Sequence, residues 1–244
     1  MHGPREQVES LAFSPDGRLL AASSDDHGVW LWSVADPGHR RELTGATNIV
    51  YGVAFDPTGR YLAAGSVDEQ VRIWDVRGPD RPLATLSGPA GYVMTVAFSP
   101  DGRTLAAGSA DHRIHRWDVR DPAHPVAAPP LSGPGNTVWG VAFSRDGGLL
   151  AASAGDRTVW AWDLRGRTPA LALRLTGATD SVFTLDLRPD GRWLAAGAAD
   201  NQVRLWNLDP EQVAGHVCAT AGTPLTRAEW DRFVTGAPYR PPCP

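Results

Sequence analysis

An eleven-residue motif occurs five times in this chain of 244 residues, and its repetition limits the possible folds more than any other feature. The first copy reads FSPDGRLLAAS from Phe13, and the later copies begin at Phe55, Phe98, Phe143 and Leu187. Tryptophans at matching positions follow one another after 42, 43, 45 and 44 residues. A single copy would predict one β-hairpin, whereas five copies at this spacing predict an array of similar units.

Each repeat carries the signals of a four-stranded β unit. An apolar, β-branched run such as IVYGVAF (residues 49–55) predicts the first strand. Ser-Pro-Asp-Gly predicts a tight turn, because proline fixes φ and glycine accepts a positive φ. Segments of the LLAAS and VRIWDV types predict the second and third strands. More variable segments predict outer strands near residues 41–45, 83–87, 127–132 and 171–176, which brings the expected total to nineteen.

This repeat resembles that of the WD40 family over residues 8–206. The Trp-Asp pair of the family occurs at Trp74-Asp75, Trp117-Asp118 and Trp162-Asp163, and is relaxed to Trp32-Ser33 and Trp206-Asn207. The resemblance implies an all-β fold, a propeller of five four-stranded blades with a short helical C-terminal tail. It also implies that the five tryptophans of these pairs, Trp32, Trp74, Trp117, Trp162 and Trp206, are structural. The expected limits are 1–208 for the propeller, 209–244 for the tail, and approximately 8–48, 49–91, 92–136, 137–180 and 181–208 for the blades.

The last repeat has only three well-marked strands. In the WD40 family the outer strand of the last blade usually comes from the opposite end of the chain, but here Gly3 already aligns with Gly45. Two alternatives follow: a five-bladed ring, or the C-terminal portion of a longer ring, which as an isolated chain would be an open arc. An open arc exposes strand edges and blade faces, so we expect such a chain to self-associate.

Five aspartates stand at one position of the repeat, in the turn between the second and third strands. In the family a Gly-His pair supplies a histidine partner for this aspartate, but this chain has no histidine at that position. We therefore expect the carboxylates to be structural and to accept backbone N–H groups within their own turns. These residues are Asp26, Asp68, Asp111, Asp156 and Asp200.

A second repeated position holds large apolar side chains. The second residue of each first strand is Tyr51, Met94, Trp139 or Phe183 in the last four repeats, and Glu9 in the first. First strands line the channel of a propeller, so the resemblance places this residue near the channel mouth. The side chains either bind a partner protein there or pack between adjacent blades.

Composition excludes several classes of function. The net charge is −4 without a basic stripe, so nucleic acid is not an expected partner. The chain has no lysine, which excludes Schiff-base chemistry and a lysine-bearing phosphate loop. The first residues lack an apolar stretch long enough for a signal peptide, and no apolar run is long enough to span a membrane, so we expect a cytoplasmic protein. His112 and His115, in a turn and the following strand, are expected to be solvated.

The tail departs from the repeat. Asp209, Pro210 and Glu211 predict the start of a helix, and a second helix is predicted over residues 225–233, before a proline-rich end. The segments 216–220, 225–226, 229–230 and 239–243 resemble the extreme C-terminus of bacterial STAND-type NTPases that carry WD40 repeats. Cys218 and Cys243 are structural thiols or a disulfide, because a metal site would need more ligands than His216 adds.

We therefore expect a non-catalytic platform for other proteins, without a cofactor or metal. The resemblance of the tail implies that it forms the sensing or scaffolding C-terminal part of a bacterial signalling protein. Two alternatives stay open: a propeller hydrolase or lyase with carboxylates and histidines at the channel mouth, and a sensor of a small ligand or glycan.

Overall fold

The computed structural model describes residues 3–220, which form nineteen strands and one helix. The first sheet contains β1 (Val8–Phe13), β2 (Leu19–Ser24), β3 (Val29–Ser33) and β4 (Arg40–Leu43). The second contains β5 (Val50–Phe55), β6 (Tyr61–Ser66), β7 (Val71–Asp75) and β8 (Ala84–Leu86). The third contains β9 (Val93–Phe98), β10 (Thr104–Ser109), β11 (Ile114–Asp118) and β12 (Val126–Leu131). The fourth contains β13 (Val138–Phe143), β14 (Leu149–Ala154), β15 (Val159–Asp163) and β16 (Ala170–Leu175). The fifth contains β17 (Val182–Leu187), β18 (Trp193–Ala198) and β19 (Val203–Asn207).

Each sheet is a blade whose strands pair with their neighbours in chain order, and all pairs are antiparallel. Four blades have four strands, and the fifth has three. The prediction of an all-β fold of five blades and nineteen strands is confirmed. Helix α1 (Pro210–Thr220) follows the last blade, as the sequence predicts. Asp209 caps its start, where Oδ1 accepts the N–H of Glu211 at 3.0 Å. The second predicted helix and the proline-rich end lie outside the described residues.

The Ser-Pro-Asp-Gly motif folds as a self-contained turn in the first blade. Ser14 Oγ donates a hydrogen bond to Asp16 Oδ1 at 2.6 Å and accepts the N–H of Leu19 at 2.9 Å. Gly17 has a φ of 70°, a left-handed conformation that glycine adopts without strain. The motif therefore fixes where β2 begins. Ser99 and Ser144 repeat these two bonds in the third and fourth blades, and the turn glycine of every later copy has a φ of 69° or 70°.

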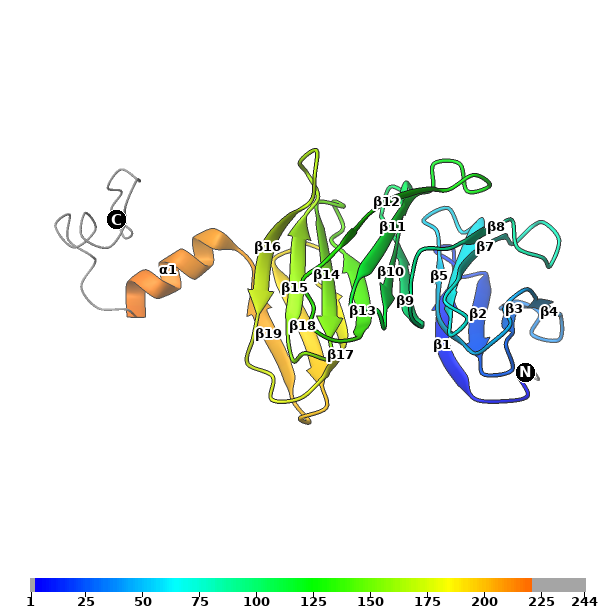
Figure 1. The fold of residues 1–244 in the computed structure, drawn as a ribbon, viewed down its shortest axis with the longest axis horizontal. Helices are drawn as coiled ribbons and strands as arrows, with labels where there is room; N and C mark the ends of the chain where they lie inside the picture. The colour runs from blue at the N-terminus through cyan, green and yellow to red at the C-terminus, as the bar shows by residue number, and fades with distance from the viewer. Residues whose placement is uncertain (1–2, 221–244) are drawn as a thin grey trace.

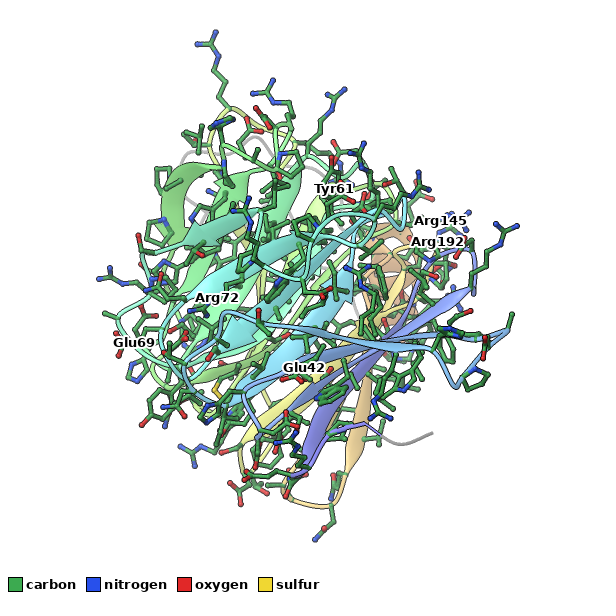
Figure 2. The ribbon with its side chains drawn as sticks, turned by 90° about the vertical axis from the view of Figure 1, so that its right-hand side faces the viewer. Glu42, Tyr61, Glu69, Arg72, Arg145 and Arg192 are labelled. Carbon is green, nitrogen blue, oxygen red and sulfur yellow. The ribbon has the colours of Figure 1, made fainter. Side chains whose placement is uncertain are left out.

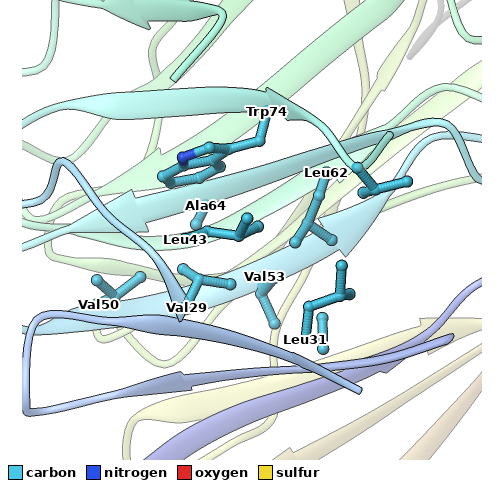
Figure 3. Packing of buried hydrophobic residues seen from close by; sticks show 10 residues of the cluster. Val29, Leu31, Leu43, Val50, Val53, Leu62, Ala64 and Trp74 are labelled. Atoms are coloured by element: carbon cyan, nitrogen blue, oxygen red, sulfur yellow. The ribbon is translucent and has the colours of Figure 1, made fainter. Parts of the chain in front are cut away.

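The hydrophobic core lies between the blades. Figure 3 shows the cluster between the first two, where Val29, Leu31 and Leu43 of the first blade meet Leu62 and Trp74 of the second. Similar clusters join each later pair of blades. Each inner blade packs one face against the preceding blade and the other against the following blade. A blade therefore needs a neighbour on each side to cover all of its apolar surface.

The five blades form an open arc. Figure 1 shows the first blade at one end of the body and the last blade at the other. Leu11 on β1 is 63% exposed, whereas Val53, its counterpart in the second blade, is 7% exposed. Val203 on β19 is 76% exposed, whereas its counterpart Val71 is fully buried. The outward faces of the first and last blades therefore expose the surface that the inner blades bury.

Candidate functional site

The ends of the strands make two faces, which we call upper and lower. The upper face carries the turns that contain Asp26, Asp68, Asp111, Asp156 and Asp200. The lower face carries the turns that contain Gly17, Gly59, Gly102, Gly147 and Gly191. In Figure 2, Glu69 and Arg72 lie towards the left, at the end of the strands that belongs to the upper face, and Arg145 and Arg192 lie towards the right, at the end that belongs to the lower face.

Each of the five upper-face aspartates joins two segments of its blade. One oxygen accepts the N–H of the residue two positions later, at 3.0 to 3.2 Å. The other accepts an N–H from the segment that precedes the first strand of the blade, at 2.7 to 2.9 Å. The carboxylate thus connects the start of the blade to the turn between its second and third strands.

A side chain on the third strand, four residues after each aspartate, supplies another donor. The ring nitrogen of Trp30 lies 3.2 Å from Asp26, Arg72 lies 2.8 Å from Asp68, and His115 lies 2.8 Å from Asp111. Trp160 and Arg204 occupy the same position beside Asp156 and Asp200. Sequence reasoning did not find these partners, although all five side chains carry an N–H group that can donate a hydrogen bond.

His115 corrects the expectation that both histidines of the third repeat are solvated. His112 is exposed in the turn, but the side chain of His115 is only 9% exposed. The alternation of β11 turns His115 towards Asp111, which gives its ring a buried acceptor. The burial of this histidine therefore follows from its strand position.

The hydrogen bonds lower the pKa of several of these carboxyls below the ordinary value of 3.8. Burial by itself raises the pKa of Asp68, but the bonds from Arg72 and the Thr47 N–H outweigh it and lower the pKa overall. Burial likewise opposes the lowering of the Asp111 pKa, which the Ala90 N–H and His115 produce. These carboxylates are thus held in the charged form by structural bonds.

The large residues of the first strands occupy matching positions on four adjacent inner strands. The second residues of β5, β9, β13 and β17 are, respectively, Tyr51, Met94, Trp139 and Phe183. The rings of Trp139 and Phe183 meet edge to face, with centroids 5.2 Å apart. Phe183 is 48% exposed, while the other three are partly buried. We call these four residues the rim.

Acidic side chains of the first blade lie beside the Tyr51 end of the rim. Glu9 holds the corresponding position on β1, and burial together with the nearby Asp25 raises the pKa of Glu9. Burial also raises the pKa of Tyr51, with smaller effects from Glu9 and Asp25. Oδ1 of Asp25 is buried and accepts no hydrogen bond from the described residues. The rim therefore offers large, mostly apolar side chains, with two carboxyl groups beside its Tyr51 end.

Residues 3–220 contain no group of three or more His, Cys, Asp or Glu side chains placed to hold a metal ion. Within the same range, no helix has the length and apolar character needed to cross a membrane.

Comparison with known families accounts for the repeat. The family model of the WD domain, G-beta repeat, matches residues 1–33, 38–75, 80–118, 128–163 and 170–207. The chain belongs to the WD40 family. The five matches fall on the five blades, so this WD40 chain has one family repeat in each sheet.

One curated relative matches the WD40 chain over a short segment. A probable cytosolic iron-sulfur protein assembly protein 1 of Chaetomium globosum is 47% identical over 38 residues. The match covers 16% of this chain and 8% of the relative. The matched segment is shorter than one period of the repeat, so the match shows similarity over the length of a single blade.

Proposed function

We propose that this WD40 chain is a non-catalytic platform for protein–protein interaction, with the rim as its docking surface. The observation that carries the proposal is the run of Tyr51, Met94, Trp139 and Phe183 along four adjacent inner strands, with the Phe183 ring about half exposed. Large, partly exposed rings held by a rigid scaffold are typical of the residues that dominate protein interfaces.

The charges beside the rim define the chemistry of the partner. Glu9 and Asp25 lie at one end, where Asp25 Oδ1 lacks a donor among the described residues. A partner with apolar side chains followed by an arginine or lysine would cover the rings and supply that donor. The preferred ligand is therefore a protein segment with an apolar stretch and a basic end.

The proposed cellular role of the platform is in signalling. The similarity of the tail to STAND-type NTPases supports a role in the sensing or scaffolding part of a cytoplasmic bacterial signalling protein. The iron-sulfur assembly relative supports no more specific role, because its similarity covers less than one repeat.

We also propose that the open ends of the arc are sites of self-association. Leu11 and Phe13 form the uncovered face at the first blade, and Val203 and Leu205 form the one at the last. These are opposite faces of a blade, the two kinds that meet wherever adjacent blades pack together in this structure. Copies of the chain can therefore associate end to end through the same type of contact.

Selection from a random peptide library tests the rim. Peptides selected on the wild-type chain are expected to carry apolar residues next to a basic one. The Phe183→Ala chain should bind them roughly 30-fold more weakly, the effect of losing an interface hot spot. Leu171→Ala removes a similarly exposed apolar side chain on β16 and serves as the matched control. Equal binding by the Phe183→Ala and wild-type chains would contradict the proposal.

A further inference from the structure

Arg116 breaks the pattern of the third strands. It is the third residue of β11, and the other blades have Leu31, Ile73, Ala161 and Leu205 at that position. Leu31, Ile73 and Ala161 are buried in the clusters that join adjacent blades. Arg116 thus places a guanidinium on the face of the third blade that packs against the fourth, where the repeat requires an apolar side chain.

The guanidinium of Arg116 has few partners there. Its Nη2 donates to the carbonyl oxygen of Pro129 at 2.9 Å, but its Nε is buried and donates to no acceptor in the described chain. It forms no ion pair with any described carboxylate, and burial lowers its pKa. A partly buried charge without a counter-ion is costly, so Arg116 weakens the fold unless an anion pairs with it.

A cavity of about 490 Å³ opens beside Arg116 on the lower face, between the third and fourth blades. Arg145 and Arg167 also line it, and neither forms an ion pair with a described residue. Phe143 and Leu164 of the fourth blade give it an apolar wall. Three arginines without carboxylate partners therefore line one cavity.

The carboxylates of this cavity are already engaged by their own turns. Asp101 accepts bonds from Ser99 Oγ and the Arg103 N–H. Asp146 accepts bonds from Ser144 Oγ and from Arg165, which hold its pKa at about 2. Asp101 pairs with Arg103 and Asp146 with Arg165, so neither carboxylate forms an ion pair with Arg116, Arg145 or Arg167.

We propose that this cavity binds a phosphate group, either free or as a phosphorylated serine or threonine of a partner protein. A phosphate carries up to two negative charges and several acceptor oxygens, which suits three arginines better than the single charge of a carboxylate does. The site lies on the lower face, opposite the rim, so it is independent of the proposed docking surface.

Isothermal titration calorimetry and thermal unfolding of the full chain test the site. The probes are inorganic phosphate and a phosphoserine peptide, with acetate as the control anion. Phosphate is expected to bind and to raise the melting temperature, and acetate is not. Arg116→Leu restores the residue of the first and last blades. It should raise the melting temperature in the absence of phosphate and weaken phosphate binding about tenfold or more.

Arg113→Gln is the matched control, since it removes an exposed arginine from the upper face of the same blade. It should bind phosphate as the wild-type chain does. Tighter binding of the phosphoserine peptide than of inorganic phosphate would identify a phosphorylated protein as the source of the group, and the reverse would identify a free phosphate. Absence of phosphate binding, equal binding by Arg116→Leu, or equal binding of acetate would each overturn the proposal.

Discussion

His115 Nε2 lies 2.8 Å from Oδ2 of Asp111, four residues earlier in the chain, and both side chains are almost buried. Asp111 also accepts the N–H groups of Ala90 and Arg113, so one carboxylate links three parts of the third blade. The other four blades build the same connection with tryptophan or arginine in place of histidine. The fold therefore needs an N–H donor at this position of the third strand, and Trp, Arg or His can supply it.

The contact predicts a measurable loss of stability when it is removed. His115→Asn is too short to reach Asp111, and it leaves a buried acceptor with fewer donors. We expect the free energy of unfolding in urea to fall by about 1–3 kcal/mol. His112→Asn makes the same chemical change in the exposed turn and should have little effect, because asparagine tolerates the left-handed φ of 70° at that residue. Equal stability of the two variants would contradict the structural role of His115.

The lowered pKa of Asp68 predicts how stability depends on pH. Its folded-state pKa lies below the ordinary value of 3.8, so its contribution is fully present above that pH and is lost as the pH falls through the folded-state pKa. Wild-type chain should therefore lose stability on acidification below about pH 4, and Asp68→Asn should lose less over the same range. Urea unfolding at several pH values measures both slopes. Gln70→Ala, in the same turn, removes no carboxyl group and is the control, so it should keep the wild-type slope.

The exposed end faces predict self-association that polar substitutions reduce. In sedimentation velocity the average mass of the wild-type chain should rise with concentration. Leu205→Gln removes apolar area from the last blade and should lower that rise without lowering the melting temperature, since the side chain is already 65% exposed. Leu171→Gln, exposed on β16, should leave association unchanged. A wild-type chain that stays monomeric at all concentrations would rule out this use of the end faces.

The sequence predicts most of this fold because its signals are local and repeated. Each turn of this type fixes the start of a strand with its glycine, and the five-fold repetition removes the ambiguity of a single apolar run. The partners of the aspartates were missed because their position holds three different residue types, Trp, Arg and His, which share only an N–H donor. An alignment of the five repeats places Arg116 at a position where the other four copies have an apolar residue. The cavity beside it depends on how the third and fourth blades pack, which the sequence does not show.

The close approach of the inner strands predicts that Gly52 tolerates no side chain. A Cβ at Gly52 on β5 would lie 2.7 Å from Cα of Thr95 on β9, and 3.1 Å from the carbonyl oxygen of Met94. Both neighbours are backbone atoms, so relief requires the second and third blades to move apart. Gly52→Ala should lower the free energy of unfolding by about 1–3 kcal/mol, the usual cost of overpacking. Gly215→Ala in α1, where a Cβ meets nothing within 4 Å, is the control and should not destabilise the blades. Unchanged stability of Gly52→Ala would show that the inner strands can separate at little cost, and that the blades are less tightly bound along the axis of the arc than their contacts imply.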